Sequence, residues 1–192
     1  MFAFLSRISF TLLVILMTIS IYMIFNYAPK EKIMGDVQRI FYFHMGSVLV
    51  FTLAFIANLV YSIKFLLDNN NEHSRIAYIN AEVGVLFTLL TIVTGMFWAK
   101  PVWGVWWTWD AKLTTTLILW FVFVAYLMLR AYGPKGSQGA RYCAIVALIG
   151  AIDAPIIYMA TEWWRSAHPE LNIGPLTESG GLDPRMYTTF LI

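Results

Sequence analysis

Five long apolar stretches separated by short polar connections dominate the pattern of this chain. They cover residues 8–28, 45–67, 83–99, 113–131 and 142–160. A membrane-crossing helix needs about 20 mostly apolar residues, and the third stretch reaches that length if it extends back to 77–99. A sixth stretch begins near Met186 and stops at Ile192. The pattern predicts an all-α polytopic integral membrane bundle of six-span type, with the sixth span (186–192) truncated, forming a single membrane domain over residues 1–192.

Composition supports a membrane protein over a soluble one. Apolar residues make up 59% of the chain and charged residues only 12%, whereas a soluble domain carries about 25% charged residues. The net charge of +2 is too small to indicate a nucleic-acid partner. The first stretch follows Arg7 without a small-residue cleavage pattern, so we expect a retained span that contacts lipid rather than a signal peptide.

The single cysteine, Cys143, limits the chemistry of the chain. It excludes an internal disulfide, a Cys-x-x-Cys metal or redox site and the Cys-x-x-Cys-His motif for covalent haem attachment. Any haem bound by this chain is therefore held non-covalently. Cys143 itself is expected to be a small core residue.

The connections between spans differ in character. Residues 68–75 are polar, and residues 133–139 form a turn-rich loop. The other three connections, 29–43, 98–110 and 162–185, hold or border most of the loop tryptophans and two histidines. Because successive spans alternate in direction, these three share one membrane face, which we call the tryptophan face. Lys and Arg are almost equally divided between the two faces, so the positive-inside rule leaves the orientation open.

The run from Trp98 to Asp110 is the most unusual segment. It holds five of the eight tryptophans within thirteen residues: Trp98, Trp103, Trp106, Trp107 and Trp109. If residues 102–110 are helical, three of the rings share one face with Asp110, while Trp109 points elsewhere. Such a shelf suits a large, flat, apolar ligand at the membrane surface. The alternative is an interfacial segment anchored by its rings, with Asp110 capping the fourth span.

Two histidines on the tryptophan face are candidate iron ligands. His44 stands where the chain enters the second span, and His168 follows the fifth. Neutral imidazole is a standard axial ligand of haem iron, although a lone histidine at a span end is often only an interfacial polar group. His73, in the polar connection on the other face, is expected to be solvated and uninvolved.

Four cations lie near these histidines: Arg39, Lys100, Lys112 and Arg165. Arg and Lys pair with carboxylates such as the haem propionates; the alternative is snorkelling to lipid phosphates. Two acids near or inside spans, Glu82 and Asp153, are left unassigned. Pro155 is expected to kink or interrupt the fifth helix.

Residues 100–114, Lys-Pro-Val-Trp-Gly-Val-Trp-Trp-Thr-Trp-Asp-Ala-Lys-Leu-Thr, resemble the tryptophan-rich "WWD" signature of haem-handling proteins. Tyr42-Phe-His44 resembles the first histidine segment of such proteins. Pro155-Ile-Ile157 followed by Glu162-Trp-Trp-Arg-Ser-Ala-His168 resembles the second. The order, the spacing and the small size together resemble the CcmC family of cytochrome c maturation proteins, over nearly the whole chain.

The resemblance implies a location and a ligand. CcmC proteins lie in the bacterial cytoplasmic (inner) membrane or an equivalent organelle membrane, with the N-terminus inside and the WWD segment (98–114 here) on the extracytoplasmic side. It implies non-covalent haem b with His44 and His168 as axial iron ligands. The remaining candidate haem-binding residues are Trp103, Trp106, Trp107, Trp109, Asp110, Arg39, Lys100, Lys112 and Arg165.

The resemblance also implies partners and a role. The family passes haem to the chaperone CcmE, and the ATP-driven CcmAB with CcmD then releases the loaded chaperone. The family is not expected to be enzymatic beyond haem-lyase-like assistance, because the bond-forming chemistry belongs to the haem. We expect this sequence to depart from the family mainly at its end, in a shortened sixth span.

Two other functions stay open on the residues alone. A dihistidine b-type cytochrome would place its ligands within spans, facing each other across a bundle, whereas both histidines here stand at span ends. A transporter moving haem across the bilayer would show internal repeats and paired interrupted spans, which the sequence lacks.

Overall fold

The computed structural model describes residues 2–32, 34–164 and 182–192. Its elements are α1 (Phe2–Tyr22), a π-helical turn η1 (Met23–Tyr27), a 3₁₀ turn η2 (Asp36–Arg39), α2 (Ile40–Asp68), α3 (Asn71–Trp103), α4 (Ala111–Tyr132), α5 (Ser137–Trp164) and α6 (Pro184–Leu191). The chain divides into two compact units, residues 1–42 with 170–192 and residues 43–169. Each unit is described by itself.

The predicted fold class is confirmed. Within the described residues, five helices are long and apolar enough to cross a membrane, and they correspond to the five stretches predicted from the sequence. The eight-residue α6 begins at Pro184, at the position of the sixth apolar stretch. The described residues contain no β-strand.

Two connections are shorter than the sequence predicts. The prediction of a loop over residues 68–75 is wrong, because α3 already begins at Asn71. The Asn70 side chain caps this helix by accepting a hydrogen bond from the Glu72 amide at 2.9 Å. Likewise α5 begins at Ser137, inside the expected loop. Both helices therefore extend beyond their apolar stretches and are longer than the hydrocarbon layer is thick.

In the smaller unit, a bend follows α1. The π-helical turn η1 ends where the Ala28 amide donates to the Met23 carbonyl at 2.8 Å. Ile24, Ala28 and Tyr42 are buried together, with Phe41 and Phe190 of α6 packed on them. The apolar side chains of α1 are largely exposed, Phe10 to 67%, as expected for a span that contacts lipid.

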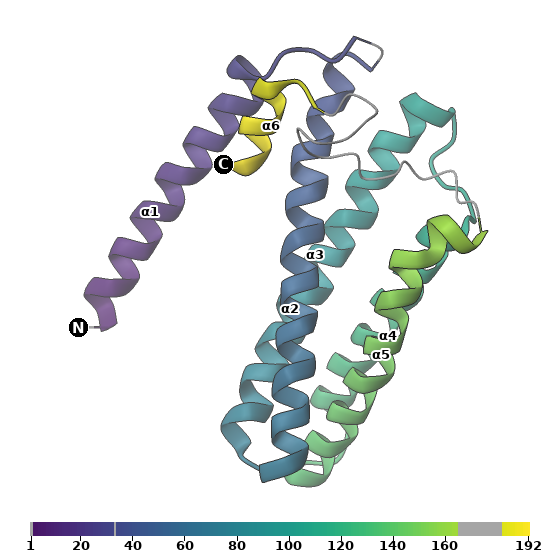
Figure 1. Cartoon of the computed structure of the whole chain (residues 1–192). Coiled ribbons are helices and arrows are strands. Elements are labelled where there is room, and N and C mark those ends of the chain that lie inside the picture. Colours follow the sequence, from purple (N-terminus) through teal and green to yellow (C-terminus); the bar gives the residue numbers. More distant parts are fainter. Residues whose placement is uncertain (1, 33, 165–181) are drawn as a thin grey trace. The chain divides into compact units, whose positions relative to one another are not determined.

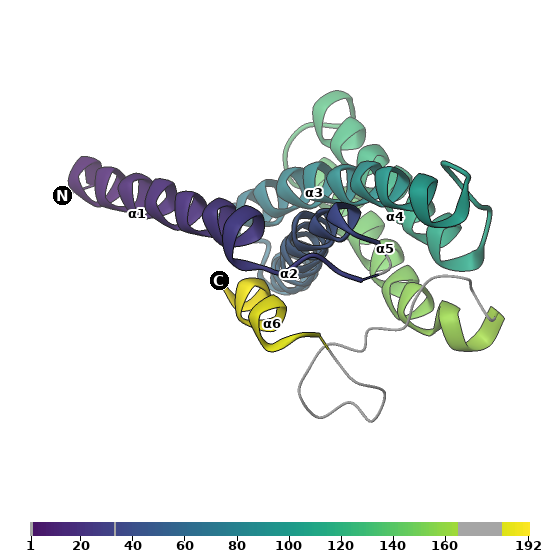
Figure 2. The same ribbon diagram turned by 90° about the horizontal axis from the view of Figure 1, so that it is seen from above.

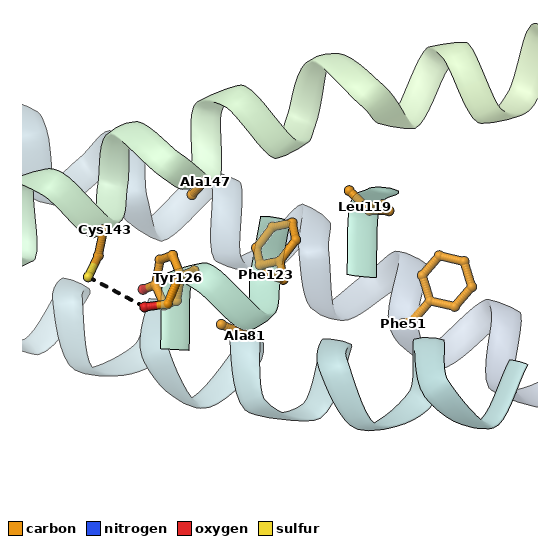
Figure 3. Close-up of a cluster of buried hydrophobic side chains, with 7 residues drawn as sticks. All are labelled: Phe51, Ala81, Leu119, Phe123, Tyr126, Cys143 and Ala147. Carbon is orange, nitrogen blue, oxygen red and sulfur yellow. Dashed lines mark hydrogen bonds between the residues drawn. The ribbon is translucent and has the colours of Figure 1, made fainter. Parts of the chain in front are cut away.

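The larger unit is a bundle of α2, α3, α4 and α5, in which α4 and α5 lie side by side (Figure 1, Figure 2). Its core takes residues from all four helices, as Figure 3 shows: Phe51, Ala81, Leu119, Phe123, Tyr126, Cys143 and Ala147. Cys143 is only 1% exposed, and its thiol donates to the Tyr126 carbonyl at 3.9 Å. The prediction that it is a small core residue is confirmed.

Small residues allow these helices to approach closely, the usual solution in membranes. On α3 and α5 the buried positions are mostly Ala, Gly, Ser, Thr or Cys and recur every three or four residues. A Cβ atom added at Gly84 would lie 2.1 Å from Cε1 of Phe55, whose ring stacks on Phe123 with the ring centres 3.8 Å apart. The core aromatic stack therefore requires glycine at position 84.

Two polar side chains and one proline lie inside the long helices. The Asn58 side chain, fully buried, donates to the Ala77 carbonyl at 2.8 Å and links α2 to α3. Glu82 is exposed and accepts a hydrogen bond from the Tyr78 hydroxyl one turn earlier. The helix α5 continues through Pro155, so this proline does not interrupt the helix, and the kink expected as the alternative stays a prediction.

Candidate functional site

The tryptophan run begins at the end of α3. The helix stops at Trp103 because Gly104 takes the left-handed conformation (φ 76°), from which its amide donates to the Lys100 carbonyl at 3.0 Å. This is a common glycine C-terminal cap. The helical interpretation of residues 102–110 is therefore wrong: residues 104–110 form an irregular segment that leads into α4.

The rings of this segment pair edge to face instead of forming one flat shelf. Trp98 with Trp103, Phe97 with Trp106, and Trp107 with Trp109 each have ring centres 5.7 Å apart, at angles of 75°, 82° and 78°. Edge-to-face contact is a favoured geometry of aromatic pairs. Trp106 and Trp109 are 49% and 76% exposed, so two large apolar faces remain uncovered at this end of the bundle.

Asp110 fixes the far end of the segment. Its Oδ1 atom accepts from the amides of Lys112 and Leu113, at 3.0 and 3.2 Å, and Thr108 donates its hydroxyl to Oδ2 at 2.8 Å. The predicted capping of the fourth span is confirmed, since these amides have no partner within the helix. The carboxylate thereby holds the tryptophan segment to α4.

Two of the candidate cations hold the same region together. Lys100 donates to the Gly104 carbonyl at 2.9 Å, and its ammonium lies 5.9 Å from the centre of the Trp106 ring. Lys112 donates to the Thr161 hydroxyl at 3.3 Å, joining α4 to α5. Both ammonium groups have further donors available for an anionic ligand, because a lysine carries three N–H groups.

His44 is positioned by α3. Its Nδ1 atom lies 3.0 Å from Oγ1 of Thr94, and the same hydroxyl donates to the Leu90 carbonyl one turn earlier at 2.7 Å. Where that hydroxyl gives its one proton to the helix carbonyl, the Thr94 oxygen accepts from Nδ1, and the neutral ring then carries its proton on Nδ1 and its lone pair on Nε2. This is the tautomer that a metal ligand bonding through Nε2 requires.

Gly95 makes room for the same ring. A Cβ atom at this position would lie 3.3 Å from Cε1 of His44, closer than an ordinary contact. Sequence reasoning did not single out Thr94 or Gly95. The available signal was the glycine inside an apolar span, which often marks a close approach of another group.

Several donors near the tryptophan segment have no hydrogen-bond acceptor within the described residues. They are the buried indole nitrogens of Trp98 and Trp107 and the buried hydroxyl of Thr114. Buried polar groups without a partner are uncommon in native structures. These groups are suited to a ligand that brings its own acceptors.

The structure brings together only part of the predicted site. His44, the tryptophans, Asp110, Lys100 and Lys112 all belong to the larger unit. Arg39 belongs to the smaller unit, where it pairs with Asp36 at 3.2 Å and lies over the Phe25 ring. His168 and Arg165 lie outside the described residues. His73 lies on α3, half-buried, with Nδ1 2.9 Å from the Asp68 carboxylate, so the expectation that it is solvated is wrong.

Comparison with known proteins decides the family. The family model of heme exporter protein C, CcmC, matches residues 1–192. The chain belongs to the CcmC family. It is 34% identical over 170 residues to heme exporter protein C of Escherichia coli K12, covering 84% of this chain and 64% of that protein. It is 35% identical over 158 residues to heme exporter protein C of Haemophilus influenzae, covering 78% of this chain and 61% of the relative.

A third CcmC relative is mitochondrial. A ccmC-like mitochondrial protein assigned to cytochrome c biosynthesis in Marchantia polymorpha is 35% identical over 158 residues, covering 82% of this chain and 67% of the relative. The chain thus spans about two thirds of the length of these curated relatives, or slightly less. The resemblance inferred from the WWD run and the two histidine segments is confirmed at the level of the family.

Proposed function

We propose that this chain binds haem at one membrane face and delivers it during cytochrome c maturation. The proposal is supported by its CcmC family membership and, above all, by the Thr94 contact that prepares His44 as a metal ligand. Haem is here the cargo of the protein. The relatives are named heme exporter protein C, and that name refers to the same cargo.

The donor set of the larger unit fits haem. His44 ligates the iron through Nε2, because Nδ1 is engaged with Thr94. The half-exposed rings of the tryptophan segment, Trp106 above all, pack on the macrocycle. His168 supplies the second axial ligand, and without a Cys-x-x-Cys-His motif the haem, haem b, stays non-covalently bound.

The charged residues act in two ways. Lys100 and Lys112, together with Arg165, neutralise the propionates, whereas a role for Arg39, which pairs with Asp36, stays a prediction from the sequence. Buried indole N–H groups of Trp98 and Trp107 add hydrogen-bond donors. Asp110, whose carboxylate is committed to the α4 amides, shapes the segment instead of touching the haem. Trp107 holds the exposed Trp109 ring in place through an edge-to-face pair, and Trp103 pairs in the same way with Trp98.

The orientation follows the family. The N-terminus lies inside, and the tryptophan segment faces the extracytoplasmic side of the inner membrane or its organelle equivalent. There a haem held by two imidazoles is presented to CcmE, and CcmAB with CcmD releases the loaded chaperone. The protein positions the haem for a bond that the chaperone forms, and it acts as a delivery protein with at most haem-lyase-like assistance.

An absorption spectrum of the detergent-purified protein tests this function. Wild type supplemented with haem is expected to show a Soret band that weakens or shifts in both His44→Ala and His168→Ala. The matched control is His73→Ala, the third histidine, which pairs with Asp68 and should leave the band unchanged. A Soret band indifferent to both ligand substitutions would overturn the site.

A redox titration separates delivery from electron transfer. A b-type cytochrome should cycle reversibly with a quinone or a partner cytochrome, whereas a delivery protein need not. Rapid and reversible reduction by quinol without any transfer of haem would favour the cytochrome.

A further inference from the structure

A cavity opens at the end of the α2–α5 bundle opposite the tryptophan segment. Its volume is about 410 Å³, and its lining residues come from the start of α3, the end of α4, the following turn and the start of α5: Asn71, Ser74, Arg130, Pro134, Lys135, Gly136, Gly139 and Ala140. The α3 helix, 33 residues long, extends about 50 Å at 1.5 Å per residue; the cavity lies at its start and the tryptophan segment at its end. The cavity is therefore distinct from the candidate haem site.

The lining of the cavity is cationic. It contains Arg130 and Lys135 and no carboxylate. No Asp or Glu of the described residues lies within salt-bridge distance of Arg130. The nearby Glu72 is engaged in an ion pair with Arg75. An arginine in a half-buried position without an acidic partner is a ready receptor for an anion.

Arg130 is held in place instead of extending freely toward lipid. Its Nη1 atom donates to the Ser74 hydroxyl at 3.0 Å, and its guanidinium lies 5.6 Å from the centre of the Tyr78 ring. Ser74 is itself buried, at 6% exposure. A guanidinium fixed on one side by a hydroxyl and a ring keeps its other N–H groups for a ligand, because it carries five of them.

The turn before α5 adds a second set of donors. Gly136 has φ 74°, and a Cβ atom at Gly139 would lie 1.8 Å from the Pro134 carbonyl oxygen, so the two glycines allow the turn to fold back onto the helix. The first N–H groups of α5 have no acceptor within the helix. The helix has no acidic residue in its first turn. Its N-terminal dipole therefore favours a bound anion.

The surroundings indicate a ligand that reaches the cavity from the membrane. Tyr132 and Tyr142, on α4 and α5 beside this turn, are 86% and 42% exposed, and apolar side chains such as Met128 and Ile145 are exposed further along the same helices. Tyrosines favour the headgroup layer, and basic pockets between membrane helices bind anionic headgroups.

We propose that this cavity binds the phosphate of an anionic phospholipid headgroup, with Arg130, Lys135 and the start of α5 as its donors. The acyl chains lie along the exposed apolar side of α4 and α5. The site is independent of the proposed haem function. A free phosphate ion shares the same chemistry, so the test distinguishes the two sources.

The experiment measures lipid retained by the full chain after delipidation in detergent and titration with phosphatidylglycerol or phosphatidylcholine, read by native mass spectrometry. Arg130→Gln with Lys135→Gln is expected to lower the phosphatidylglycerol affinity about tenfold or more, since each loses charge-assisted hydrogen bonds. The matched control is Lys64→Gln with Arg141→Gln, which removes the same charge from exposed positions outside the cavity. It should stay within about twofold of wild type, on the scale of exposed pairs.

Inorganic phosphate, added as a competitor, distinguishes the sources. Displacement of phosphatidylglycerol only at high phosphate concentration supports the lipid. Phosphate binding that depends on Arg130 and Lys135, with no preference for phosphatidylglycerol over phosphatidylcholine, overturns the lipid assignment. Equal losses in the cavity and control variants overturn the site itself. If Arg130→Gln fails to fold, the exposed Lys135→Gln alone is the second variant, with a smaller loss expected in the same direction.

Discussion

Replacing Thr94 with valine removes the hydroxyl that positions the His44 ring while keeping the shape and branching of the side chain. Thr94 Oγ1 lies 3.0 Å from His44 Nδ1 and 2.7 Å from the Leu90 carbonyl, so it accepts from the imidazole when its own proton goes to that carbonyl. In the valine variant the imidazole loses the partner that fixes its tautomer and its orientation. The ring is then free to rotate and to change tautomer, so haem binding must itself fix the form that has its lone pair on Nε2.

The size of the effect follows from the hydrogen bond that is lost. A typical hydrogen bond contributes about 0.5–1.5 kcal/mol, and about 1.4 kcal/mol corresponds to a tenfold change in a dissociation constant. We therefore expect Thr94→Val to weaken haem binding about twofold to tenfold, with the protein still folded. Thr94→Ser, which keeps the hydroxyl, should stay close to wild type.

The assay is a haem titration of detergent-purified protein followed at the Soret band. Thr91→Val is the matched control, because the Thr91 hydroxyl donates to the Phe87 carbonyl at 2.9 Å in the same way but makes no hydrogen bond to a histidine of the described residues. Identical haem affinities for Thr94→Val and Thr94→Ser would refute the positioning role. So would an equal loss in Thr91→Val, which would indicate a general effect of the helix.

Two further substitutions test the bundle and the tryptophan segment. Gly84→Ala places a Cβ atom 2.1 Å from the Phe55 ring, so it should lower the free energy of unfolding by about 1–3 kcal/mol, as overpacking does. Gly46→Ala is the control, because a Cβ atom there would have nothing within 4 Å. Equal thermal stabilities of the two variants would contradict the packing. Asp110→Ala removes the cap of α4 and should lower the free energy of unfolding by about 1 kcal/mol, whereas Asp110→Asn keeps a hydrogen-bond acceptor. Thermal melts in detergent compare the two variants. An unchanged melting midpoint for Asp110→Ala would contradict the capping role.

The number and place of the spans followed from the sequence because about 20 consecutive apolar residues have one stable solution in a bilayer. Helix ends were less predictable. Asn71 and Glu72 are polar enough to indicate a loop, yet they form the first turn of α3 because Asn70 caps it. Asp110 was predictable because a capping carboxylate acts on its own sequence neighbours.

The tryptophan segment shows where periodicity misleads. Spacing alone placed three rings on one helical face, but the left-handed Gly104 ends the helix after Trp103. A glycine tolerates both conformations, so its choice depends on packing that the sequence pattern does not contain. The contact of His44 with Thr94 could not be predicted either, because it joins residues 50 positions apart in the chain. It depends on how α2 and α3 are aligned along each other. Its existence depends on the small residues that let these helices meet.

Transfer of haem to CcmE tests the central proposal most directly. Haem-loaded protein is mixed with the apo-chaperone, and covalent haem on the chaperone is detected by haem staining after denaturing electrophoresis. We predict labelled chaperone with wild type and with His73→Ala, and none with the His44→Ala, His168→Ala double variant. Equal labelling by the folded double variant would contradict the account.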